Sequence, residues 1–185
     1  MIFQRKHILI SAVVLFSLLS VFLAKWHWNQ RARGEQGRPH GLVRIDKSAI
    51  RFDDGDTFFY KQLTIRLLGI DAPEIVHKEH GIFEDQPYGP RAAVFTADML
   101  RKATRVEYLP FQNDKYGRLL AHVFVDGELL SVLLIKAGLA YETVSYYGDN
   151  GFPELAERIL RAARESPRPP FERPDRWRRK HQIKQ

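Results

Sequence analysis

The stretch that decides the fold occupies residues 66–74 and reads RLLGIDAPE. Its first part completes an apolar run of the kind that forms a buried strand. Pro73 ends the strand region, because proline cannot donate a hydrogen bond to the ladder of a sheet. Arg66, Asp71 and Glu74 lie in the same short stretch. The sequence therefore places three charged side chains on, and directly after, a strand that we expect to be buried.

Working outward from this stretch, short apolar runs bounded by turn residues predict strands. These strands cover residues 42–52 with a polar break at 46–48, then 57–60, 63–68, 105–111 and 119–125. Apolar residues at helical spacing predict helices starting at Pro90, over 130–137 with Gly138 as a cap, and over 153–164. Five strands, a helix after the third and helices at the end indicate an α+β fold and match a five-stranded OB-fold β-barrel with three helices. Periodicity alone does not separate this barrel from another small α+β fold.

The N-terminal part carries an uncharged apolar run at residues 8–24, about 26 Å long as a helix. Trp26 and Trp28 follow it, as residues of a membrane interface do. We expect residues 1–28 to form an N-terminal hydrophobic helix that anchors the chain in a membrane. A cleaved signal segment and a buried soluble helix are the alternatives, although no small-x-small cleavage site is evident.

The rest of the chain divides by composition. Residues 29–40 are polar and predict a linker, 41–166 a globular domain, and 167–185 a basic, irregular tail rich in Pro and Arg. Residues 39–157 carry 13 Lys/Arg and 18 Asp/Glu, so the net charge of +7 comes from the two ends. A surface that simply coats nucleic acid is therefore not expected on the domain. The absence of cysteine excludes disulfides, zinc–thiolate sites and a cysteine nucleophile.

Three clusters carry the residue types that phosphodiester hydrolysis needs. They read DGDT at 54–57, RLLGIDAPE at 66–74 and DKYGR at 114–118. A hard cation takes carboxylate and carbonyl oxygens, and arginine forks bind phosphate. Taken singly, each cluster is also typical of a turn or a solvated charge. Asp71 lies five residues after Arg66, so a regular strand would point the two side chains to opposite sides.

Together and in this order, the clusters resemble the staphylococcal nuclease (thermonuclease) family over about residues 43–165. The resemblance implies a Ca²⁺-dependent nuclease that hydrolyses DNA and RNA with little sequence preference and leaves 3′-phosphates. The implied metal ligands and catalytic residues are Asp56, Asp71 and the carbonyl of Ala72 for calcium, Arg66 and Arg118 for phosphate, and Glu74 for the attacking water. Asp54 is implied as support, and Lys115 and Tyr116 as contacts to the nucleotide. The family's usual threonine is replaced by Ala72, which removes a hydroxyl beside the cation.

Several further expectations accompany this interpretation. An OB-fold module that only binds nucleic acid is the main alternative, and a tethered interaction domain with a vestigial site is a third. The loop 75–87 holds His77 and several acids, but a solvated loop is favoured over a second metal site. We expect a monomer whose nuclease domain lies on the extracytoplasmic side of a membrane, or is secreted if the N-terminal segment is cleaved. Basic residues of the tail are expected to hold a polyanion or acidic lipid, or simply to be solvated.

Overall fold

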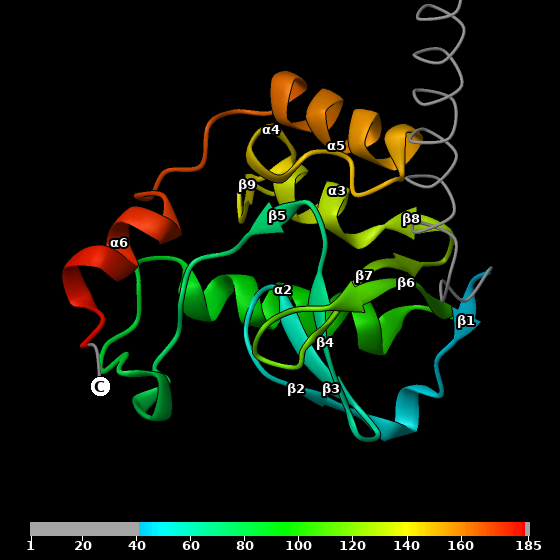
Figure 1. The fold of residues 1–185 in the computed structure, drawn as a ribbon, viewed down its shortest axis with the longest axis horizontal. Coiled ribbons are helices and arrows are strands. Elements are labelled where there is room, and N and C mark those ends of the chain that lie inside the picture. The colour runs from blue at the N-terminus through cyan, green and yellow to red at the C-terminus, as the bar shows by residue number, and fades with distance from the viewer. Residues whose placement is uncertain (1–40, 184–185) are drawn as a thin grey trace, which may run out of the picture. The chain divides into compact units, whose positions relative to one another are not determined.

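A computed structural model describes residues 41–183 of the chain, shown in Figure 1. The predicted hydrophobic helix over 1–28 and linker over 29–40 lie outside these residues. Among the helices that the structure describes, none has the length and apolar character needed to cross a membrane.

The predicted α+β class is confirmed: the domain is built on a curled, mixed sheet with helices packed against it (Figure 1). In sheet order the strands run β1, β6, β7, β4, β3, β2, and β8 extends the sheet from β7. Their bounds are β1 (Val43–Arg44), β2 (Ile50–Phe52), β3 (Thr57–Tyr60), β4 (Leu63–Leu67), β6 (Val106–Asn113), β7 (Leu119–Val125) and β8 (Glu128–Leu129). The β4–β7 pair is parallel and the other pairs are antiparallel.

A second, two-stranded sheet lies beside the first and joins β5 (Ile70–Asp71) to β9 (Tyr141–Glu142). The sequence did not indicate it, because neither strand is long enough to show an alternating pattern. It matters for function because it holds Asp71 opposite Tyr141.

The three predicted helices are present as α2 (Gly89–Lys102), α3 (Leu130–Lys136) and α5 (Pro153–Glu165). Proline stands in the first turn of α2 and of α5, where its missing N–H breaks no helical hydrogen bond. The structure adds a short helix, α4 (Val144–Tyr147), and a C-terminal helix, α6 (Pro174–His181).

The core lies between the curled sheet and helices α2, α3 and α5. Its largest fully buried apolar side chains include Phe58, Ile65, Leu67, Leu100, Leu130, Leu134 and Ile159. Burying one such side chain stabilises the fold by about 1.5–3 kcal/mol. The core thus fixes β3, β4 and α2, and these three elements border the charged residues of 54–57 and 66–74.

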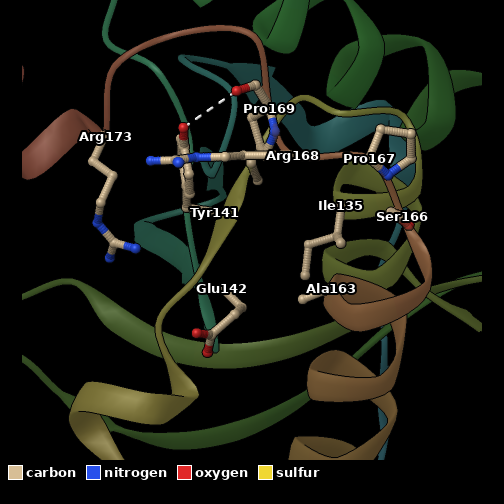
Figure 2. A pocket seen from close by; sticks show the side chains of 10 residues that line it. Ile135, Tyr141, Glu142, Ala163, Ser166, Pro167, Arg168, Pro169 and Arg173 are labelled. Atoms are coloured by element: carbon tan, nitrogen blue, oxygen red, sulfur yellow. Dashed lines mark hydrogen bonds between the residues drawn. The ribbon is translucent and has the colours of Figure 1, made fainter.

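The prediction of an irregular tail over 167–185 is wrong for Pro174–His181, whereas residues 167–173 are irregular as expected. Phe171 and Trp177 are buried, and the segment forms α6. Tyr141 donates its hydroxyl to the carbonyl of Phe171 (2.6 Å) and of Pro169 (3.2 Å), the second contact drawn in Figure 2. Two aromatic side chains inside a stretch otherwise rich in Pro and Arg supply the apolar area that docks it.

Where the chain enters this tail, residues 166–169 border a small pocket beside Ile135 and Ala163 (Figure 2). The lining of this pocket includes none of the site residues predicted from sequence. The charged side chains predicted from sequence meet instead at the end of β4, where Arg66 contacts Asp56 and Asp71.

Candidate active site

Arg66 brings two carboxylates together at the end of β4. Its guanidinium donates to Asp56 through Nη1 and to Asp71 through Nη2, the latter at 2.9 Å. Strand β3 pairs with β4 so that Thr57 faces Arg66, which places Asp56 at that level of the sheet. The convergence of Arg66 and Asp71, not expected in a regular strand, follows from the turn at Gly69 (φ +79°) between β4 and β5.

Asp56 is held rigidly. Its side chain is only 2% exposed, and Oδ2 accepts the backbone N–H of Ala72 at 2.8 Å. Asp54 accepts the backbone N–H of Asp56 at 2.9 Å, which agrees with the supporting role expected for it. Gly55 allows a close approach to α2, because a Cβ there would lie 2.7 Å from the Cβ of Ala92 and 2.8 Å from that of Ala72.

Glu74 follows directly in the loop after β5 and is anchored through its backbone. Its N–H donates to the side-chain oxygen of Gln86 at 3.2 Å, and its carbonyl accepts the N–H of Gln86 at 2.9 Å. Gln86 is fully buried and donates in turn to the carbonyl of Glu172 at 2.6 Å. The loop between Glu74 and α2 is therefore cross-linked at its base, and the tail is part of that cross-link.

Arg178 of α6 is a site residue that sequence reasoning missed. Its Nη2 lies 2.8 Å from Asp71 Oδ2, its Nη1 lies 3.2 Å from Asp71 Oδ1, and Nη1 also donates to Glu74. More than a hundred residues separate Arg178 from these carboxylates. The only sequence signal was the basic character of the tail, which does not indicate which of its arginines is directed into a site.

Arg118, Lys115 and Tyr116 form a separate group in the turn between β6 and β7. The Arg118 guanidinium pairs with Asp114 at 2.7 Å and lies over the Tyr116 ring, as does Lys115. The structure does not bring these side chains into contact with Asp56, Asp71 or Glu74 among the interactions of the described residues. Arg118 nevertheless stands directly before β7, whose Leu120 is paired with Arg66.

Burial sets the electrostatics of the carboxylates. It raises the pKa of Asp56 to about 7, against the opposing charge of Arg66. Burial also raises the pKa of Asp54, opposed by Arg66, and the pKa of Glu74, opposed by Arg178. Such displaced carboxyl pKa values are typical of sites that await a cation or transfer a proton.

The donor set fits a hard divalent cation. Asp56 and Asp71 offer carboxylate oxygens from two buried positions next to one another, and oxygen is what Ca²⁺ takes as ligand. A second grouping, of Asp54, Glu74 and His77, has ligand atoms within 4.8 Å of one another. His77 fits a metal poorly, because its Nε2 is bonded to Asp53 (2.9 Å) and this hydrogen bond raises the pKa of His77 to about 9. Asp54 and Glu74 of this grouping remain oxygen donors for a hard cation.

Comparison with known proteins points to one family. The family model described as staphylococcal nuclease homologue matches residues 64–166, more than half of the 185 residues. The thermonuclease of Staphylococcus hyicus is 36% identical over 122 residues, which cover 63% of this chain and 68% of that protein. The thermonuclease of Staphylococcus intermedius is 40% identical over 95 residues, which cover 49% of this chain and 55% of that protein. Endonuclease YncB of Bacillus subtilis is 34% identical over 125 residues, which cover 62% of this chain and 58% of that protein. The chain therefore spans only 55–68% of the length of these relatives.

Proposed function

Because the chain belongs to the family of staphylococcal nuclease homologues, we propose that it is a calcium-dependent nuclease acting on DNA and RNA with little sequence preference. The observation that carries the proposal is the joining of Asp56 and Asp71 by Arg66, with Glu74 directly beside them. The mixed sheet that positions them is proposed to be an OB-type barrel.

The proposed roles follow from the chemistry of each group. Asp56, Asp71 and the carbonyl of Ala72 would hold Ca²⁺, which supplies positive charge to the phosphate when bound. Glu74 accepts the proton of the attacking water, and its raised pKa brings it closer to the pH at which it must act. Arg66 and Arg118 donate their forks to the phosphate oxygens, on which negative charge accumulates.

Substrate contacts beyond the phosphate are proposed at Lys115 and Tyr116. Tyr116 is 70% exposed, and Lys115 and Arg118 lie over its ring, so a base that stacks on Tyr116 would also meet these cations. The acidic domain itself attracts nucleic acid weakly, and the basic ends of the chain would supply general attraction.

A module that only binds nucleic acid is the second candidate. The exposed Tyr116 beside Arg118 and Lys115 favours it. The buried Asp56–Arg66–Asp71 arrangement favours catalysis, because burying charges costs free energy that a binding surface has no need to spend.

The experiment incubates the purified full-length protein with single-stranded DNA in Ca²⁺ or in excess chelator. The proposal expects degradation to products with 3′-phosphates in Ca²⁺ and intact DNA in chelator. Bound but uncleaved DNA under both conditions would support the binding module instead.

Location and assembly are separate proposals. We propose a monomer tethered through residues 1–28, with the nuclease domain outside the cytoplasm. Weak extracellular calcium sites of about 10⁻⁴–10⁻³ M suffice there. Protease treatment of intact cells tests the location: cleavage of the domain is expected, and its protection would contradict the proposal.

A further inference from the structure

We propose that Arg178 is an active-site residue that competes with the divalent cation for Asp71 and also pairs with Glu74, so that docking of Arg178 and cation binding oppose each other. The inference rests on the proposed cation site. It assigns to the C-terminal helix a direct role in setting the cation affinity.

The contacts of Arg178 carry the proposal. Its guanidinium spans both oxygens of Asp71 and reaches Glu74 with the same Nη1 atom. The side chains are mostly enclosed: Arg178 is 27% exposed, Asp71 9% and Glu74 11%. An ion pair in such surroundings is screened far less than one on the surface.

The carboxylate oxygens have few free positions left. Asp71 Oδ1 accepts from both Arg66 and Arg178, and Asp71 Oδ2 accepts from Arg178. A cation that used these oxygens would have to replace N–H donors and would meet two guanidinium charges at close range. Arg66 belongs to strand β4, whereas Arg178 sits on a terminal helix. Arg178 is therefore the donor that can leave with the smaller change in the fold.

Helix α6 is held by contacts that do not involve the carboxylates. The side chain of Trp177 is buried, and its stacking on His181, with ring centroids 4.5 Å apart, is internal to the helix. The N–H of Ile183 donates to the carbonyl of Gly81 at 2.9 Å, and the side chain of Gln182 donates to the carbonyl of His80 at 2.8 Å. These contacts keep the guanidinium at a high local concentration beside Asp71, as a tethered competitor would be.

The test measures Ca²⁺ binding by titration calorimetry on the full-length protein, without nucleic acid. Arg178→Ala is compared with the wild type and with Arg176→Ala, which removes one positive charge from an exposed position of the same helix. We expect Arg178→Ala to bind Ca²⁺ at least about tenfold more tightly than Arg176→Ala, because a competing state no longer has to be displaced. Arg178→Lys keeps the positive charge but loses the forked guanidinium. Its Ca²⁺ affinity is expected to lie between those of Arg178→Ala and Arg176→Ala.

The outcomes separate this inference from the proposed function. Equal Ca²⁺ affinities in Arg178→Ala and Arg176→Ala, or weaker binding in Arg178→Ala, overturn the competition and leave the cation site standing. Absence of Ca²⁺ binding in all variants overturns both.

Thermal melting provides a second readout that needs no activity. In chelator, Arg178→Ala is expected to melt at a lower temperature than Arg176→Ala, because Asp71 and Glu74 lose a neutralising charge. Ca²⁺ at the same saturating concentration should raise the melting temperature of Arg178→Ala more than that of Arg176→Ala, since stabilisation by a ligand grows with the logarithm of its concentration divided by its dissociation constant. Equal Ca²⁺-induced shifts would contradict the proposal.

Discussion

Arg66 joins the carboxylates of Asp56 and Asp71 at the end of β4. Arg66→Met would leave the buried Asp56 without its charged partner and Asp71 with Arg178 alone. Breaking a buried ion pair in this way costs about 3–5 kcal/mol, and loss of one charge-stabilising donor reduces catalysis by about 10²–10³-fold. Chemical denaturation and the rate of DNA degradation check both expectations.

Arg51→Met is the matched control, because Arg51 is exposed on β2. It should leave stability and rate close to those of the wild type. Equal effects of the two substitutions would show that Arg66 is a surface charge rather than the centre of the site.

The His77–Asp53 pair predicts a pH dependence of stability. The folded-state pKa of His77 is raised from 6.5 to about 9 by its hydrogen bond to Asp53. A raised histidine pKa contributes stability that is fully present below pH 6.5 and is lost as the pH rises through 9. His77→Gln should therefore lower the free energy of unfolding at pH 6. The expected loss is limited to about 1–2 kcal/mol, because partial solvent exposure screens the pair.

Urea denaturation of wild type and His77→Gln between pH 6 and pH 10 measures this difference, with His80→Gln on the exposed neighbouring position as control. The difference in the free energy of unfolding between wild type and variant should shrink with rising pH only for His77→Gln. A gap that stays constant across the range would refute the assigned charge.

Much of the site was predictable from local sequence. Asp56, Asp71, Arg66 and Glu74 lie together as the motif order indicated. Two features were not. The meeting of Arg66 with Asp71 depends on the turn at Gly69, and Arg178 arrives from a distant helix through tertiary packing alone. The spacing of residues along one strand predicts neither the Arg66–Asp71 contact nor the position of Arg178.

At the scale of elements, the terminal helix α6 depends on a single large anchor. Trp177 is 5% exposed, whereas the other residues of the helix apart from Pro174 are at least partly accessible. Trp177→Ala should release α6 from the domain, because an eight-residue helix is not stable in water alone. Limited trypsin digestion should then cleave faster at the arginines of α6.

Tyr147→Ala provides the control, because that side chain is 76% exposed. It is expected to leave the digestion pattern of α6 unchanged. Slow cleavage in Trp177→Ala would mean that the side-chain contact of Gln182 and the backbone contact of Ile183 suffice to hold the helix.

Helices α2, α3 and α5 were predictable because apolar residues recur on one face of each. Helix α6 was not, since its composition is dominated by charge and only Trp177 and its flanking proline are buried. Pro174 in the first turn, Asp175 next to it and basic residues in the last turn are nevertheless the signals of a capped helix. The high proline and arginine content of the tail favoured the prediction of an irregular segment in spite of these signals.

At the scale of the whole molecule, charge is segregated. The domain between 39 and 157 is acidic while the ends are basic, and the structure shows that one basic end folds back onto the acidic site through Arg178. That part of the tail is therefore engaged with carboxylates instead of being free for a polyanion. The exposed Arg176 of α6 is still available for general attraction, whereas Arg179 pairs with Asp175 at 3.1 Å.

The measurement that tests the central claim most directly is the Ca²⁺-dependent rate of single-stranded DNA degradation by Glu74→Gln. Glu79→Gln, an exposed acid in the same loop, is the matched control. We expect Glu74→Gln to degrade DNA about 10²–10⁴-fold more slowly than the wild type, and Glu79→Gln to keep the wild-type rate. Undiminished degradation by Glu74→Gln would contradict the assignment of this site.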